Sequence, residues 1–184
     1  KAVEIYRSFC KGELLPTDTI TAEMAKLTEN AFRDVNIAFA NELSLICENL
    51  GIDVWELIRL ANHHPRVNIL QPGPGVGGHC IAVDPWFIVS ADPKNSRLIR
   101  SAREVNDSKR AWVLNKISEA VSKSNSSNVA VLGLTFKADI DDLRTSPALS
   151  IAEEFAKSHP TVRILAVEPI IPELPAKLNP LSNV

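Results

Sequence analysis

The sequence has 184 residues, of which 45% are hydrophobic and 23% charged, the composition of a folded globular protein rather than a disordered one. Its 20 basic and 22 acidic residues give a net charge of −2, which offers no electrostatic support for binding nucleic acid or an anionic membrane. The longest mostly apolar run, residues 81–90, contains an aspartate and a proline and is too short to span a membrane.

The first part of the chain is predicted to be helical. Residues 2–10 have a helical pattern, and residues 11–21 form a connection rich in helix-capping side chains. Residues 22–50 contain neither Gly nor Pro, follow a Thr/Asp-rich segment and precede Gly51. Because these are start and stop signals, we expect one long helix here, followed by a short helix over residues 53–62.

Two further helices are expected before the pattern changes. Asp84 lies at the start of a helix over residues 84–89, with Pro85 in the first turn, where its missing N–H is tolerated. Residues 95–123 form another helical stretch, either continuous or broken near residues 106–108.

The last third of the chain changes to an alternation of strands and a helix. A polar break at residues 124–127 precedes a buried-strand pattern over residues 128–134, a helix over residues 147–158 and a second buried strand over residues 162–167. Strand, helix, strand is the beginning of a parallel α/β domain. One helix and two strands do not complete such a sheet, so this domain is expected to be incomplete.

The predicted fold is therefore a mainly α domain, residues 1–124, followed by an incomplete Rossmann-like α/β domain, residues 125–184. The sequence begins at Lys1, and its only methionine is Met24. We expect it to be a piece of a longer protein.

Glycine is concentrated in one loop. Four of the seven glycines lie within six residues of the segment 71–80, QPGPGVGGHC. Such a loop lets main-chain N–H groups approach a bound phosphate or sugar closely. It is not a Rossmann glycine turn, because no strand precedes it and a proline interrupts it.

Cys80 follows this loop directly, and Asp84 lies four residues further on. A thiol beside a ligand-binding loop is a candidate nucleophile, although a free cysteine is also a common buried hydrophobe. Cys10 and Cys47 have no such surroundings and are expected in the core. Three cysteines without close spacing argue against a disulfide scaffold and favour a reducing, cytoplasmic location.

Two other sets of residues could carry chemistry. Lys26 and Asn30 share one helical face, which is either a solvated stripe or a cation and an amide directed at negative charge on an oxygen. The histidines and the cysteine in and near the glycine loop are also possible zinc ligands. Their spacing in the sequence matches no zinc-binding pattern, so we predict no metal site. The residues weighed for zinc are His63, His64, His79 and Cys80.

Three motifs, in this order, make the sequence specific. They are AKLTEN at residues 25–30, GVGGHCIAVD at residues 75–84, and GLTFK at residues 133–137 followed by DLRTSP at residues 142–147. In these motifs the sequence resembles the UDP-glucose/GDP-mannose dehydrogenase family over essentially its whole length.

Within that family, two segments resemble the branch that acts on UDP-N-acetyl-D-mannosamine. They are RDVNIA at residues 33–38 and HPRVN at residues 64–68. The resemblance implies oxidation of the C6 alcohol of this UDP-sugar to a carboxylate with NAD, for surface polysaccharide biosynthesis.

The resemblance also implies an organisation. The family has an N-terminal NAD-binding domain, a central helical domain that forms the dimer, and a C-terminal domain that holds the nucleotide. The sequence resembles the second and the beginning of the third, so this chain alone is expected to be inactive. The alternative is a non-catalytic dimerisation or UDP-sugar-binding module. A homodimer is expected through the helix at residues 22–50, whose small residues would let a second backbone approach: Ala25, Ala31, Ala38 and Ala40.

Catalytic roles follow residue by residue from the resemblance. Cys80 matches the thiol that forms a thiohemiacetal and then a thioester. Lys26 and Asn30 match positions that stabilise negative charge on the substrate oxygen, and Asp84 matches one that handles water and protons. Arg144 matches a contact to NAD.

The remaining implied contacts hold the substrate. The main chain from Ile69 to Gly75, together with Gly77, matches the loop that binds sugar and nucleotide. Arg66 matches an arginine that reaches the substrate of the partner subunit, and Lys137 matches a contact to the nucleotide.

Overall fold

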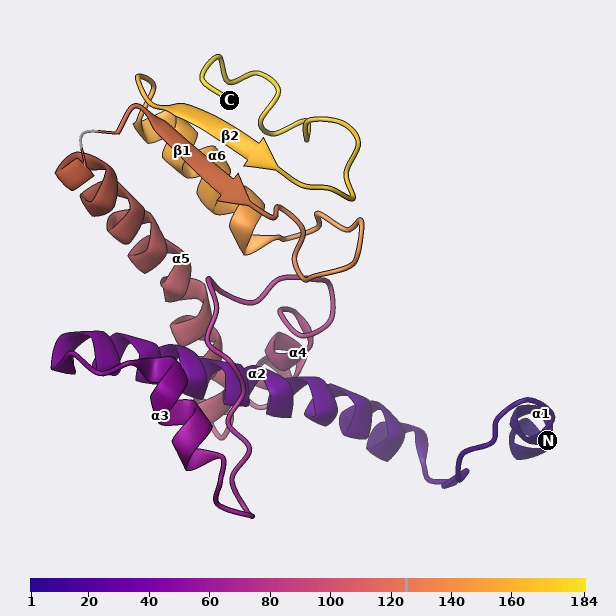
Figure 1. The fold of residues 1–184 in the computed structure, drawn as a ribbon. Helices are drawn as coiled ribbons and strands as arrows, with labels where there is room; N and C mark the ends of the chain where they lie inside the picture. The colour runs from indigo at the N-terminus through magenta and orange to yellow at the C-terminus, as the bar shows by residue number, and fades with distance from the viewer. Residues whose placement is uncertain (125) are drawn as a thin grey trace.

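The computed structural model describes residues 1–124 and 126–184, and it is mostly helical with one small parallel sheet (Figure 1). No helix among these residues has the length and apolar character needed to cross a membrane. The elements are α1 (Ala2–Arg7), α2 (Thr19–Leu50), α3 (Val54–Ala61), α4 (Asp84–Ala91), α5 (Arg97–Ser124), β1 (Asn128–Leu132), α6 (Pro147–Ser158) and β2 (Arg163–Val167).

Helix α2 confirms the predicted long helix and begins three residues earlier than expected. Asp18 caps it by accepting a hydrogen bond from the Thr21 main-chain N–H at 2.9 Å. Gly51 ends it in the left-handed conformation, with φ of 68°, as the stop signal predicted. One side of α2 packs against α4 and α5.

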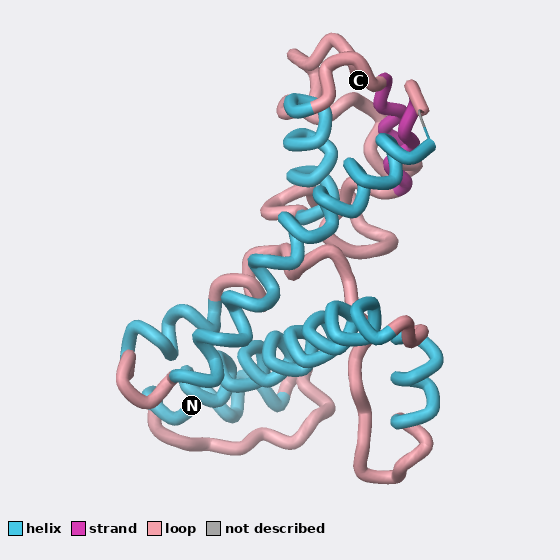
Figure 2. Tube along the Cα trace, turned by 90° about the vertical axis from the view of Figure 1, so that its left-hand side faces the viewer, coloured by secondary structure: helices cyan, strands magenta, loops and turns pink. Residues whose placement is uncertain are grey.

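Helix α5 is continuous, so the break considered near residues 106–108 does not occur. Ser108 donates back to the Val105 carbonyl at 2.8 Å, and Asn106 is buried against α2, where its side chain has partners. Both residues are therefore accommodated inside the helix. α5 runs from its crossing with α2 to the sheet. Figure 2 shows it as one long helix that joins the two parts of the molecule, the helical part with α1 to α4 and the part with β1, β2 and α6.

The order strand, helix, strand is confirmed, but the prediction that both strands are buried is wrong: β1 has no buried residue and β2 has one, Ile164, because α6 covers one face of the sheet and the other face is exposed. β1 and β2 pair in parallel, with register from Asn128 opposite Arg163 to Leu132 opposite Val167. α6 starts at Pro147, after Ser146 accepts a hydrogen bond from the Leu149 N–H at 3.2 Å. The polar break predicted at residues 124–127 includes residue 125, which lies outside the described residues.

The sheet, α6 and the C-terminal segment enclose an apolar core. The end of α5 contributes Leu114, Ile117 and Val121 to it. The fully buried members are Leu134, Leu149, Ala152, Phe155, Ala156, Ile164 and Leu178.

Candidate active site

The glycine loop, defined here as residues 69–80, is held by side chains at three points of its main chain. Asn62, at the end of α3, accepts from the Ile69 N–H at 2.8 Å and donates to the Ile69 carbonyl at 3.0 Å. Asn41 on α2 accepts from the Gly73 N–H at 2.8 Å. Thr145, just before α6, donates to the Gly78 carbonyl at 3.0 Å. The loop is therefore fixed by both parts of the molecule.

Gly77 is glycine because another segment packs directly on its backbone. A Cβ atom at this position would lie 2.8 Å from Phe136 Cβ, from Pro147 Cδ and from the Thr145 carbonyl oxygen. Thr145 itself has φ of 51°, a left-handed conformation that is costly for a β-branched residue. The chain that follows β1 is thus pressed against the loop that precedes Cys80.

The structure brings Asn30 and Asp84 together across 54 positions of sequence. Asn30 Nδ2 donates to Asp84 Oδ2 at 2.6 Å, and Asn30 is buried. The Asp84 N–H in turn donates to the Cys80 carbonyl at 2.8 Å, which folds Cys80 to Asp84 into one tight turn at the start of α4. Helix α2 and the thiol segment therefore meet at this point.

Cys80 is exposed, so it is not a packed core residue. Cys47 is buried as expected, and Cys10 is partly buried. Since none of the three is in a disulfide, Cys80 is the thiol best placed to meet a ligand.

Lys26 remains on the surface, and its ammonium contacts Glu29 at 2.9 Å. That hydrogen bond is the main cause that raises the pKa of Lys26, and the Cys80 and Asp84 groups add smaller contributions. Lys26 lies one helical turn before Asn30, which contacts Asp84, so both belong to the same face of α2. Lys26 is exposed, as a solvated stripe would be, whereas Asn30 is buried, which a solvated stripe does not explain.

Arg144 is exposed just before Thr145, and its guanidinium is held by Asp142. The contacts to the two Asp142 oxygens are 2.6 to 3.0 Å long. They lower the pKa of Asp142 to about 2, while Asp142 raises the pKa of Arg144 and Cys80 adds a smaller contribution. An exposed cation is thereby kept at the edge of the site.

Two models of one protein family match the chain. The model of the UDP-glucose/GDP-mannose dehydrogenase family, central domain, matches residues 20–108, and that of its UDP binding domain matches residues 130–183. The chain belongs to the UDP-glucose/GDP-mannose dehydrogenase family. It carries regions of the central and the UDP-binding domains.

Individual relatives agree with this assignment. UDP-N-acetyl-D-mannosamine dehydrogenase of Escherichia coli (strain K12) is 60% identical over 100% of this chain and 45% of the relative. NDP-N-acetyl-D-galactosaminuronic acid dehydrogenase of Ralstonia nicotianae is 59% identical over 97% of this chain and 42% of the relative. The chain therefore spans less than half the length of these curated relatives.

A solved structure shows the same fold. UDP-D-ManNAc dehydrogenase from Pyrococcus horikoshii aligns with a TM-score of 0.85 and 42% sequence identity. The alignment covers 98% of this chain and 44% of that one.

The family resemblance also places Arg66 and Lys137 at the substrate, in addition to the cluster formed by Asn30, Cys80 and Asp84. Arg66 is exposed after α3, where its main-chain N–H donates to His64 Nδ1 at 3.3 Å. Lys137 is exposed, with its ammonium 5.8 Å from the centre of the Phe136 ring. Among the described residues, neither side chain has a hydrogen bond or ion pair to this cluster, so their roles stay predictions.

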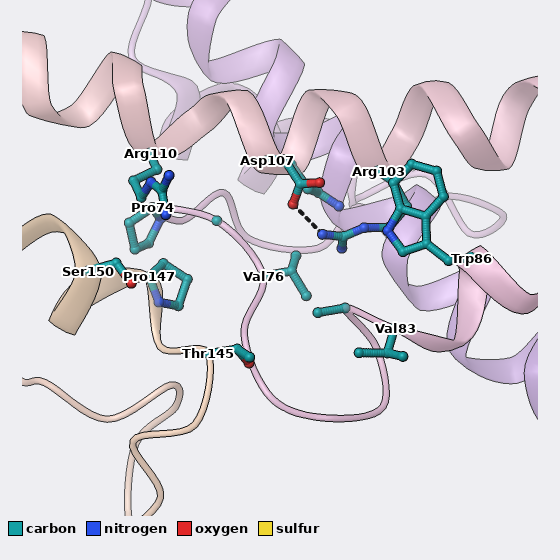
Figure 3. A pocket seen from close by; sticks show the side chains of 13 residues that line it. Pro74, Val76, Val83, Trp86, Arg103, Asp107, Arg110, Thr145, Pro147 and Ser150 are labelled. Carbon is teal, nitrogen blue, oxygen red and sulfur yellow. Dashed lines mark hydrogen bonds and ion pairs between the residues drawn. The ribbon is translucent and has the colours of Figure 1, made fainter.

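A cavity of about 310 Å³ borders the glycine loop at residues 74–76 (Figure 3). Val76 of the loop, Trp86 of α4 and Arg103 of α5 line it, with Thr145 and Pro147 on the opposite side. Figure 3 also shows the ion pair between Arg103 and Asp107. Within residues 1–124 and 126–184, no three His, Cys, Asp or Glu side chains gather closely enough to hold a metal ion.

The sequence analysis missed the side chains that hold the loop. Polar residues on α2 at positions 30, 34 and 41 follow the helical period together with buried alanines, and residues 103 and 106 do the same on α5. That spacing is the signal that could have indicated a polar helix interface. The left-handed Thr145 gives no comparable signal, because a β-branched residue is not expected in that conformation.

Proposed function

We propose that the protein carrying this chain is a nucleotide-sugar 6-dehydrogenase that oxidises UDP-N-acetyl-D-mannosamine to UDP-N-acetyl-D-mannosaminuronate with NAD, for surface polysaccharide biosynthesis. The observation that carries the proposal is the hydrogen bond from Asn30 to Asp84, because it joins the AKLTEN helix to the turn that presents Cys80. The 60% identity to the Escherichia coli enzyme supports the substrate.

Cys80 is the nucleophile of the proposed reaction. In the first oxidation, C6 loses a hydride and its hydroxyl loses a proton, which gives an aldehyde. The Cys80 thiolate adds to C6 and forms a thiohemiacetal. Loss of a second hydride from C6 gives a thioester; water then attacks its carbonyl carbon, the C–S bond breaks, and the carboxylate and the thiol are released. NAD, when bound, accepts the hydride of each oxidation.

Lys26 and Asn30 stabilise the negative charge that develops on the C6 oxygen. An ammonium has three N–H donors and an amide has two, so the contacts to Glu29 and Asp84 leave donors for the substrate. Asp84 orients the water that hydrolyses the thioester and takes up its proton. Asn30 and Asp84 also hold each other in place before substrate binds.

The glycine loop binds the UDP-sugar through its main chain, from Ile69 to Gly75 and at Gly77. Arg66 reaches the substrate of the partner subunit, which its exposed position after α3 allows. Lys137 contacts the nucleotide. Arg144 fits a contact to a phosphate of NAD, because its guanidinium is exposed next to Thr145, which holds the glycine loop, and Asp142 keeps it oriented.

We also propose a homodimer through α2, but not for the reason expected from the sequence. Of the four alanines expected there, Ala31, Ala38 and Ala40 are buried inside this chain and are not available to a second backbone, whereas Ala25 is exposed. The exposed apolar side chains of α2 are the better candidates for the interface. They include Ile20, Met24, Phe32 and Phe39. A monomer at high micromolar concentration in equilibrium sedimentation would contradict the dimer.

The alternative is a dimerisation or UDP-sugar-binding module without activity of its own. This alternative concerns the 184 residues as a separate polypeptide, which span 45% of the length of the Escherichia coli relative. We propose that the 184 residues alone do not reduce NAD with any UDP-sugar. NADH formation that survives repurification of this chain would contradict that. Because the three cysteines are free, we assign the protein to the cytoplasm.

The test of the function is Cys80→Ser in the complete protein, assayed with NAD and a panel of UDP-sugars. Serine has a similar shape but is far less nucleophilic than a thiolate, so the second oxidation should be slowed much more than the first. Stopped-flow NADH formation and mass spectrometry should find stalled aldehyde in the variant and acid in the wild type. Full turnover to the uronic acid by the variant would contradict the mechanism. The panel includes UDP-N-acetyl-D-galactosamine, since the Ralstonia relative carries a different sugar in its name at nearly the same identity.

A further inference from the structure

A chain of buried hydrogen bonds connects the glycine loop to an ion pair between α2 and α5. It runs from the Gly73 main chain through Asn41 and Asn106 to Asp34, which pairs with Arg103. Each of these four side chains is at most 2% exposed. The loop is therefore attached to the most deeply buried charges of the helical part.

Every bond in this chain has a forced direction. The Gly73 N–H can only donate, so Asn41 Oδ1 must accept it, at 2.8 Å. The amide nitrogen of Asn41 then donates to Asn106 Oδ1 at 2.9 Å. The amide nitrogen of Asn106 donates to Asp34 Oδ1 at 2.8 Å and to the Asp34 carbonyl at 3.1 Å.

The chain ends on the Asp34 carboxylate, where Arg103 Nη1 donates at 2.6 Å. Because a carboxylate only accepts, it fixes the orientation of both asparagine amides and, through them, the position of Gly73. Within the described residues, Asp34 Oδ2 and Arg103 Nε are buried without a hydrogen-bond partner.

We propose that Asn41 is a positioning residue of the reaction. It holds Gly73 and thereby sets where the main-chain groups of the glycine loop meet the UDP-sugar. This inference rests on the proposed function, in which the glycine loop binds the substrate. Among the described residues, the side-chain hydrogen bonds of Asn41 go to the loop backbone and to Asn106, so we assign it a role through the loop and not on the reacting atoms.

The experiment compares Asn41→Asp and Asn41→Leu with the wild type in the complete protein at two pH values. A protonated carboxyl can replace the amide, because its C=O accepts from Gly73 and its O–H donates to Asn106. An ionised carboxylate cannot donate and would face the Asn106 oxygen. The ionisable groups in and beside the chain are Asp34 on α2 and, on α5, Arg103, Asp107 and Lys109. Burial and the Asp34 charge should raise the pKa of the new carboxyl into the accessible range.

Asn41→Asp should raise KM for the UDP-sugar about tenfold at about pH 9 and little at about pH 6, with kcat changed less than KM. Asn41→Leu should raise KM at both pH values. Each KM is divided by the wild-type KM at the same pH, which removes the pH dependence of catalysis itself. Phe155→Leu, in the apolar core away from the loop, is the control for general destabilisation and should leave KM unchanged at both pH values.

Hydrogen exchange of the Gly73 amide, measured without substrate, separates the two proposals. Faster exchange at high pH in Asn41→Asp relative to wild type, after correction for intrinsic rates, supports the anchoring even if no UDP-sugar is oxidised. If exchange is faster and no UDP-sugar is oxidised, the proposed function is contradicted, but the attachment of Gly73 by Asn41 is supported. If Gly73 exchange and relative KM are the same in all variants at both pH values, Asn41 does not position the loop.

Discussion

The two parts of this molecule have cores of opposite chemistry. Between α2 and α5 the buried side chains are alanines and hydrogen-bonded polar groups, among them Asp34, Asn41 and Arg103. Around β1, β2 and α6 they are apolar, with Phe155 and Leu178 as examples. Apolar burial stabilises without direction, whereas each hydrogen bond fixes an orientation. The loop that carries Cys80 is attached to the directional core through Asn41, and Thr145 holds it from the other part.

The largest difference between the two cores should appear in Arg103→Met. Removing the guanidinium leaves Asp34 charged and buried without its partner, which should cost about 3–5 kcal/mol of unfolding free energy. Phe155→Leu keeps an apolar side chain in place and should cost about 1 kcal/mol. The unfolding free energies of both variants are measured by urea denaturation and compared with that of the wild type.

The double variant Arg103→Met with Asp34→Leu removes both charges and should recover most of the stability. The contrast between the cores would be wrong if Arg103→Met lost no more stability than Phe155→Leu. It would also be wrong if the double variant were the least stable of the three.

The apolar core could be predicted from the sequence, whereas for the polar core the helical spacing could indicate a polar interface but not which residues pair. The strands and α6 follow from apolar runs with Ser146 and Pro147 at the helix start, and α2 follows from its capping residue and Gly51. Periodicity places Lys26 and Asn30 on one helical face but does not distinguish the exposed Lys26 from Asn30, which is buried against α4. The partners of Asn41 and Asp34 lie 65 and 69 residues away, a relation that no local pattern contains.

For the candidate site, the sequence indicated which segments to expect there but not their geometry. Clustered glycines indicated the loop, and the motifs placed Cys80 beside Asp84. The packing of Phe136 and Pro147 on Gly77 depends on how the two parts of the molecule meet. That arrangement is a result of tertiary packing, since glycine here is required by close approach rather than by a turn type.

A smaller loss of stability is expected from a substitution at Gly77, where the two parts of the molecule are in contact. Gly77→Ala puts a methyl group 2.8 Å from three atoms, one of them the Thr145 carbonyl oxygen, and should cost about 1–3 kcal/mol. It should also change the alkylation rate of Cys80, measured by mass spectrometry of the labelled peptide. Gly73→Ala is the matched control, because its nearest contact would be 4.0 Å away. Equal stability of the two variants would show that the contact at Gly77 gives way easily.

The smallest loss of stability is expected from breaking the exposed ion pair between Arg144 and Asp142. This pair differs in burial from the one between Arg103 and Asp34. Arg144 lowers the pKa of Asp142 from 3.8 to about 2, chiefly by hydrogen bonding, whereas burial raises the pKa of Asp34 and Arg103 opposes that rise. Arg144→Ala should therefore return the pKa of Asp142 toward 3.8 in an NMR titration of the carboxyl carbon.

The two aspartates should give opposite pH dependences of stability. A lowered pKa means that Asp142 contributes stability above pH 3.8, which is lost as the pH falls toward about 2. A raised pKa means that the contribution of Asp34 is present below its ordinary pKa and is lost as the pH rises through the raised one. Because Arg144 is exposed and screened by solvent, its removal should barely change the denaturation midpoint at neutral pH. A pKa of Asp142 that stays near 2 in Arg144→Ala would show that the main-chain N–H at position 144, 2.9 Å from Asp142 Oδ1, holds the carboxylate instead of the guanidinium.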